Sequence, residues 1–123
     1  MKALYEILRA LSQEEQFLWN EPMSRHTTFR VGGPADLMYF PESEAQVCAA
    51  LQAARTRGVP VLVMGNGSNM IVRDGGVRGL VIVLGERFAQ VQVEGSILTA
   101  QAGASLAKVA SAAQGASLSG LEF

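Results

Sequence analysis

The chain has 123 residues, a net charge of −1 and 49% hydrophobic residues. This length and composition fit one folded domain and exclude a disordered segment. The lysines and arginines are scattered, so no concentrated positive field predicts a nucleic-acid partner.

The single cysteine, Cys48, excludes an intrachain disulfide and a Cys-rich metal site, and we expect no bound metal. The apolar runs are much shorter than the ~20 residues that span a bilayer. The start of the chain lacks the pattern of a signal peptide. We therefore expect a cytoplasmic protein with no membrane partner.

The first predicted element is a helix over residues 2–12, because apolar residues recur there at helical spacing. A polar stretch around Asn20 and Pro22 separates this helix from the rest of the chain. The expected organisation is therefore residues 1–19 as an N-terminal helix and linker, followed by a domain over residues 20–123.

The next three elements predict a strand, a helix and a second strand. Residues 35–40 form an apolar strand ended by a proline. Ser43 and Gln46 have the spacing of a capping box, and Gly58 stands where a C-terminal glycine cap belongs. Residues 59–64 are apolar and mostly β-branched. This order predicts a βαβ unit with two parallel strands.

The remainder of the sequence is richer in strands than in helices. Short strands are predicted at residues 70–72 and 79–85, and a hairpin over residues 91–102. A last helix is expected between Ser105, its N-cap, and Gly115. The sequence thus predicts mixed α and β structure, with more hairpin character than a doubly wound fold.

Five residues that cannot build a core interrupt the apolar stretch after residue 64: Gly65, Asn66, Gly67, Ser68 and Asn69. Alternate glycines allow close approach of another group and unusual φ angles. Successive N–H groups of such a loop can converge on an anion, and the serine and asparagine side chains add donors. An Asn-Gly turn between two strands explains the same residues. Both interpretations stay open on the residues alone.

Two common phosphate-binding motifs are excluded at this loop. A P-loop needs a lysine after its last glycine, and this sequence has Ser68 there. A dinucleotide fingerprint opens a helix, whereas Met70 and the residues after it continue as an apolar strand. Any diphosphate at this loop would therefore lie between two strands.

Four segments in order resemble the amino-terminal part of the UDP-N-acetylenolpyruvoylglucosamine reductase family, also called UDP-N-acetylmuramate dehydrogenases. They are His26-Thr27-Thr28-Phe29-Arg30-Val31-Gly32-Gly33-Pro34-Ala35, Gly65-Asn66-Gly67-Ser68-Asn69, Ala102-Gly103-Ala104-Ser105-Leu106 and Ser119-Gly120-Leu121-Glu122-Phe123. Each segment alone is a weak signal, but their order and spacing agree from about residue 20 to the end.

The resemblance implies an α+β, FAD-binding fold of the vanillyl-alcohol oxidase type, of which residues 20–123 would form the first, incomplete α/β subdomain. It implies that FAD is bound by Gly65, Asn66, Gly67, Ser68, Asn69 and Met70. It also places Thr28 and the Gly32-Gly33 segment close to the cofactor. A simple turn before a strand explains Gly32-Gly33 equally well.

The family reduces UDP-N-acetylglucosamine enolpyruvate to UDP-N-acetylmuramate with NADPH, a step in peptidoglycan precursor synthesis. A UDP-sugar and NADPH are therefore the implied partners. The family's catalytic serine, arginine and glutamate lie beyond the Gly-Leu-Glu-Phe stretch with which this sequence ends. We accordingly assign no catalytic residue, and we expect this chain alone to be inactive and to hold FAD weakly.

Two alternatives remain from the sequence. One is a non-catalytic module that binds FAD or a nucleotide. The other is a flavin oxidase of the same fold, in which the only histidine, His26, would carry covalent FAD.

Overall fold

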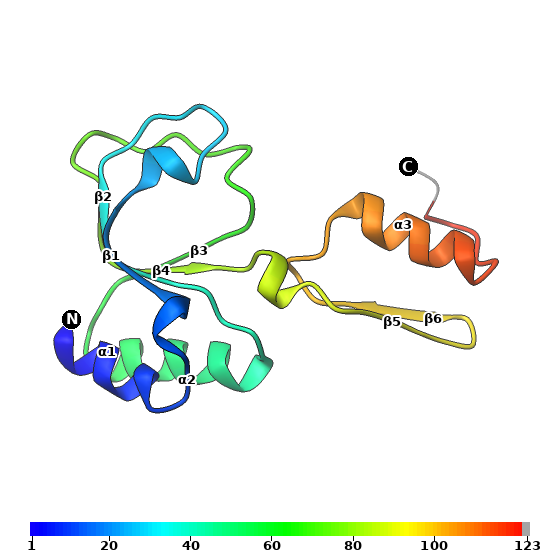
Figure 1. The fold of residues 1–123 in the computed structure, drawn as a ribbon, viewed down its shortest axis with the longest axis horizontal. Helices are drawn as coiled ribbons and strands as arrows, with labels where there is room; N and C mark the ends of the chain where they lie inside the picture. Colours follow the sequence, from blue (N-terminus) through cyan, green and yellow to red (C-terminus); the bar gives the residue numbers. More distant parts are fainter. Residues whose placement is uncertain (122–123) are drawn as a thin grey trace.

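The computed structural model describes residues 1–121 and contains a four-stranded sheet, a separate hairpin and three α-helices (Figure 1). The helices are α1 (Lys2–Arg9), α2 (Glu44–Thr56) and α3 (Leu106–Gly115). The strands are β1 (Phe17–Pro22), β2 (Pro34–Tyr39), β3 (Val61–Met64), β4 (Val77–Val83), β5 (Val91–Glu94) and β6 (Ile97–Ala100). Short 3-10 helices are η1 (Glu14–Gln16), η2 (Met23–Arg25) and η3 (Glu86–Phe88). The Glu122-Phe123 end of the fourth motif lies outside the described residues.

The four strands of the main sheet lie in the order β1-β2-β4-β3. β2, β4 and β3 are parallel, and β1 runs antiparallel to β2. The predicted βαβ unit is thus confirmed, with β4 inserted between its two strands. Because β3 and β4 are parallel neighbours, with Met64 opposite Val83, their carboxyl ends meet at the same edge of the sheet.

Alternate residues of the central strands point to opposite faces of the sheet and enter two buried clusters. Leu37, Tyr39, Leu80 and Ile82 face α1 and α2. On the other face lie Met38, Val81 and Val83, with Met23 and Val72 from the connecting segments. Both faces of the sheet are therefore covered, as is usual for parallel strands.

The N-terminal helix is shorter than predicted and ends at Arg9. Its Leu4 and Leu8 are fully buried in the cluster that contains the central strands. The Tyr5 ring contacts those of Phe17 and Trp19, with centroids 4.9 and 5.1 Å apart. The division into residues 1–19 and 20–123 remains a prediction, although β1 spans both sides of it.

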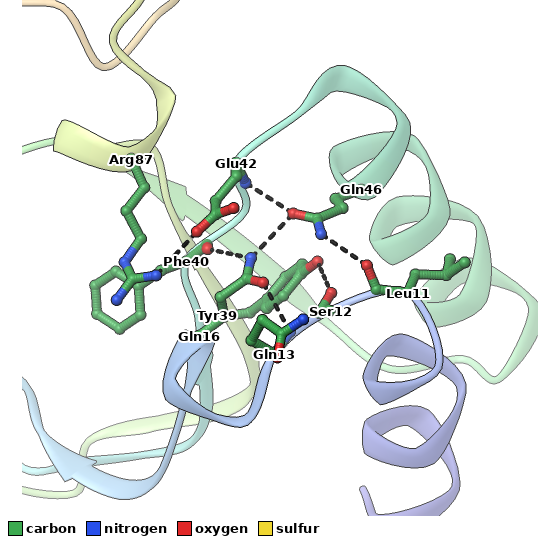
Figure 2. Close-up of polar contacts among 9 residues, drawn as sticks. All are labelled: Leu11, Ser12, Gln13, Gln16, Tyr39, Phe40, Glu42, Gln46 and Arg87. Atoms are coloured by element: carbon green, nitrogen blue, oxygen red, sulfur yellow. Dashed lines mark hydrogen bonds and ion pairs between the residues drawn. The ribbon is translucent and has the colours of Figure 1, made fainter.

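A network of side-chain amides joins the segment between α1 and β1, the end of β2 and the start of α2 (Figure 2). Gln46 Nε2 donates to the carbonyl of Leu11, and Gln46 Oε1 accepts from Gln16 Nε2. The predicted capping box is only half present. Ser43 Oγ accepts from the Gln46 N–H, but Gln46 Oε1 accepts from the N–H of Glu42 rather than that of Ser43.

The predicted strand at residues 70–72 is wrong, because this stretch belongs to an irregular connection between β3 and β4. The side chain of Val72 is buried, but Ile71 is 75% exposed. The next residue, Arg73, uses its carbonyl to accept the N–H groups of Gly33 and Gly76. The bond from Gly33 joins this connection to the one between β1 and β2, and the bond from Gly76 closes a turn within it, so neither extends the sheet.

Figure 1 shows β5, β6 and α3 projecting to one side of the main sheet. We call residues 1–83 the body and residues 89–121 the arm. The predicted hairpin and last helix are both confirmed, and Ser105 Oγ accepts the N–H of Lys108 at the start of α3. Within residues 1–121, no helix is both long enough and apolar enough to cross a bilayer.

Candidate functional site

The glycine loop, residues 65–69, follows β3 and separates two cavities. The first has a volume of about 790 Å³ and the second about 390 Å³. Gly65 and Asn66 line both cavities, whereas the residues from Gly67 to Met70 line only the second. The structure therefore places all six predicted cofactor-binding residues at cavity walls, and only the first two also face the larger cavity.

The larger cavity lies at the carboxyl ends of the parallel strands. On one side it is lined by Met64 and the start of the glycine loop, and on another by Val83, Gly85 and Glu86 after β4. The third side is the segment between β1 and β2, which contributes residues from Ser24 to Arg30. In open sheets with parallel strands, this edge is where ligands usually bind.

Most main-chain N–H groups of the glycine loop are unoccupied. The Ser68 N–H donates to Asn66 Oδ1 at 3.1 Å, which closes an Asx turn. Within residues 1–121, the N–H groups of Gly65, Asn66, Gly67 and Asn69 donate no hydrogen bond. No group of the described chain therefore competes with an anionic ligand for these donors.

Gly67 holds the loop against the segment between β1 and β2. Its φ is +72°, and a Cβ atom there would lie 2.1 Å from the carbonyl oxygen of His26. Its own carbonyl accepts the N–H of Thr28 at 3.2 Å. By contrast, a Cβ at Gly65 would meet no protein atom within 4 Å. Gly67 is thus required by the fold, whereas the space at Gly65 is open.

The Gly32-Gly33 segment is explained by contacts within the chain. A Cβ at Gly33 would lie 1.9 Å from the carbonyl oxygen of Asp74, and one at Gly32 would lie 2.7 Å from Cβ of Val72. The close approach that these glycines allow is therefore made by the connection between β3 and β4. Of the residues that the resemblance placed near a cofactor in this part of the chain, Thr28 lines the larger cavity.

Cationic and acidic side chains share the wall of the larger cavity. Arg25, Arg30 and His26 line it together with Glu86. Glu21, whose side chain is 9% exposed, accepts a hydrogen bond from Arg25 at 3.1 Å and lies 3.6 Å from Nε2 of His26. Three side chains that are or can become positively charged therefore border the space in front of the glycine loop.

Sequence reasoning missed the walls contributed by Ser24, Arg25, Val83, Gly85 and Glu86. These walls could have been found from the strand topology. Two neighbouring parallel strands end at the same edge of a sheet, so the loops that follow them lie close together. Residues 59–64 and 79–85 were predicted as strands, but their pairing was not.

Comparison with known proteins identifies a family match over most of the chain. Residues 34–122 match the model of an FAD binding domain. The chain is 49% identical over 108 residues to the UDP-N-acetylenolpyruvoylglucosamine reductase of Moorella thermoacetica, covering 88% of this chain and 35% of that protein. It is 40% identical over 119 residues to the reductase of Alkaliphilus oremlandii, covering 97% and 39%. The chain thus spans little more than a third of the length of these relatives.

Solved structures share the fold at low sequence identity. An alkyldihydroxyacetonephosphate synthase superposes with a TM-score of 0.75 at 20% identity, over 94% of this chain and 26% of that one. The 4-ethylphenol oxidase from Gulosibacter chungangensis gives 0.69 at 15% identity, over 94% and 24%. The predicted α+β fold of the vanillyl-alcohol oxidase type is confirmed.

Proposed function

This chain belongs to the FAD binding domain family, and from that premise we propose that its glycine loop holds the diphosphate of FAD in a UDP-N-acetylenolpyruvoylglucosamine reductase. The match to an FAD binding domain agrees with FAD as the cofactor predicted from the sequence. The observation that carries the proposal is the set of free main-chain N–H groups at the end of β3.

The residues at this edge fit a dinucleotide. The two cavities that meet at Gly65 and Asn66 have volumes in the range of ordinary ligand sites. Consecutive free N–H groups suit a diphosphate, and the side chains of Arg25 and Arg30 add positive charge beside it. The proposed diphosphate-binding residues are Gly65, Asn66, Gly67, Ser68, Asn69 and Met70.

The activity proposed for the whole protein is the NADPH-dependent reduction of UDP-N-acetylglucosamine enolpyruvate to UDP-N-acetylmuramate, for peptidoglycan synthesis in the cytoplasm. FAD, when bound, accepts a hydride from one substrate and delivers it to the other. The part assigned to this chain is binding and orientation, with residues 20–123 as the first part of the FAD-binding domain. None of its residues is assigned a catalytic role.

An alanine at Gly65 tests the proposal. The substitution adds a methyl group at a position that lines both cavities, and no protein atom lies within 4 Å of it. We expect Gly65→Ala to fold normally and to raise the Kd for FAD about tenfold, which corresponds to about 1.4 kcal/mol. Titration of FAD into the labelled chain, followed by NMR chemical shifts, measures even the weak binding that we expect.

Gly75→Ala is the matched control. A Cβ at Gly75 also meets no atom within 4 Å, and this residue lines neither cavity. Its Kd for FAD should equal that of the unmodified chain. Equal affinities of Gly65→Ala and Gly75→Ala for FAD would contradict the proposal. Gly67→Ala is unsuitable as a test, since its clash with His26 would disturb the fold itself.

A further inference from the structure

A row of apolar side chains crosses the sheet at the edge that carries the glycine loop. Met64 ends β3, Val83 ends β4 and is its partner in the sheet, and Phe40 directly follows β2. Tyr39, the residue before Phe40, is paired with Ile82, the residue before Val83. Each of the three parallel strands therefore contributes one apolar residue at this edge. We call Phe40, Val83 and Met64 the apolar row.

The three side chains of the apolar row point to the same face of the sheet. Met64 and Val83 belong to the buried cluster on that face, and the partly buried Phe40 packs against it. Figure 2 shows the ring of Phe40 beside Arg87 and away from the ring of Tyr39. Neighbouring strands are about 4.8 Å apart, so the row extends over about 10 Å.

The apolar row borders two adjoining cavities. Met64 and Val83 line the larger cavity, next to Gly65. A further cavity of about 270 Å³ is lined by Phe40, and it shares Val83, Gly85 and Glu86 with the larger one. The apolar surface therefore continues from the first residue of the glycine loop, past Val83, to the ring of Phe40.

Other walls of the larger cavity have the opposite chemistry. The N–H groups of Gly65 and Asn66 donate to no group of the described chain, and Arg25 and Arg30 add positive charge. A cavity with an apolar floor and a few polar groups that converge on one side is typical of small-molecule sites. The anion of a ligand would satisfy the polar side, and an apolar part of the same ligand would cover the floor.

We propose that the apolar row binds a planar ring of the nucleotide whose diphosphate is held by the glycine loop. The ring covers Met64 and Val83 and packs against the ring of Phe40. This inference rests on the proposed function, because the diphosphate fixes the end of the ligand beside Met64. FAD carries two planar rings, adenine and isoalloxazine, and either has the chemistry that this surface selects.

Nuclear Overhauser effects between ligand and protein test the contact directly. When FAD is added to the 123-residue chain, the methyl groups of Met64 and Val83 should show these effects with ring protons of the ligand. Met38 and Val77 are the matched controls, because both side chains pack in the same cluster and line neither cavity. Their methyl groups should show no such effect. Adenine and isoalloxazine protons give separate signals, so the same spectrum identifies the ring.

A substitution measures what the contact contributes to binding. Phe40→Leu keeps the residue apolar but removes its aromatic ring, and it should raise the Kd for FAD roughly two- to tenfold. The Kd for inorganic pyrophosphate, which has a diphosphate and no ring, should stay unchanged. Phe29→Leu is the matched control, because Phe29 is 56% exposed and lines neither cavity, although its neighbours Thr28 and Arg30 line the larger one. This variant should change neither Kd.

The outcomes separate this inference from the proposed function. FAD that binds without Overhauser effects from its rings to Met64 or Val83 would overturn the ring site and leave the diphosphate site intact. An equal rise in the Kd of Phe40→Leu for FAD and for pyrophosphate would also overturn it, because the substitution would then act through the glycine loop. An unchanged Kd of Phe40→Leu for FAD would contradict the role of Phe40. Failure of both FAD and pyrophosphate to bind would overturn the proposed function and this inference together.

Discussion

The body and the arm differ in how completely they bury their side chains. Among the described residues, all large side chains that are fully buried belong to the body. In the arm, Ala113 is buried, while Leu106 is 65% exposed and Ile97 is also exposed. Both regions have regular secondary structure, but only the body has a core on two sides of a sheet.

This difference shows where a binding site can be held rigidly. The larger cavity is lined by residues of the body, together with Gly85 and Glu86 at its junction with the arm. Loops at the edge of a well-packed sheet keep their geometry because the strands that carry them are buried. The arm contributes no residue to this cavity.

The largest expected effect compares one leucine from each region. Leu80 is fully buried at the centre of β4, so Leu80→Ala should lower the free energy of unfolding by about 2–5 kcal/mol. Leu106→Ala, on the exposed face of α3, should cost about 0.5 kcal/mol or less. Urea denaturation measures both. Equal losses would show that the arm has a core of its own in solution.

A smaller effect concerns a buried hydrogen bond of the body. The hydroxyls of Tyr39 and Ser12 lie 2.6 Å apart, and Tyr39→Phe should cost about 1 kcal/mol at neutral pH because Ser12 loses its partner. The double variant Ser12→Ala/Tyr39→Phe should recover part of this loss. No recovery would show that the phenyl ring, and not the hydroxyl pair, is responsible.

The same substitution should change how the free energy of unfolding depends on pH in alkaline solution. Burial raises the pKa of the Tyr39 phenol, the carboxylate of Glu42 adds to the rise, and the Ser12 hydrogen bond opposes it. The unfolded chain therefore ionises this group first, near pH 10. The stability that the protonated Tyr39 phenol contributes is fully present below about pH 10. It is lost as the pH rises through the pKa of the folded state. Tyr39→Phe should flatten this fall in denaturation experiments across that range.

The smallest effect concerns the ion pair between the body and η3, the short helix that precedes the arm. Arg87 of η3 lies 2.9 Å from Glu42, and both side chains are exposed (Figure 2). Arg87→Gln should lower the free energy of unfolding by about 0.2–1 kcal/mol at low salt. The difference should vanish in 1 M salt, where charges are screened within about 3 Å. Arg57→Gln is the control, because it breaks no ion pair within residues 1–121. A decrease in the free energy of unfolding of Arg87→Gln that does not depend on salt would contradict this account.

The sequence predicted α1, β2, α2, β3, β4 and the position of the glycine loop because these depend on local signals. It missed β1, whose Asn20 and Pro22 were expected to lie in a polar stretch that separates the first helix from the domain. Periodicity, caps and the Gly-Asn spacing are properties of neighbouring residues. The order β1-β2-β4-β3 is not local, and it alone brings Ser24–Arg30 against a loop some 40 residues away. The largest wall of the cavity was therefore invisible to periodicity and spacing.

The error at residues 70–72 has a related cause. Ile71 and Val72 are β-branched and favour a strand on propensity. The preceding loop and the bonds from Gly33 and Gly76 to Arg73 instead hold this stretch in an irregular path. Tertiary contacts that no local pattern encodes thus overrode the preference of the residues.

The connection between β3 and β4 makes close main-chain contacts with the rest of the body at two separate positions. Gly67 is in contact with His26, and Gly76 lies so close to Pro34 that a Cβ there would be 2.0 Å from its carbonyl oxygen. An inserted residue near Ser68 would enlarge an exposed bend and leave the strands aligned. An insertion just before Gly76 would instead shift the register of β4 against β2. Because the first half of this connection is the proposed diphosphate loop and the second half sets the register of β4, its length should vary little along the whole connection.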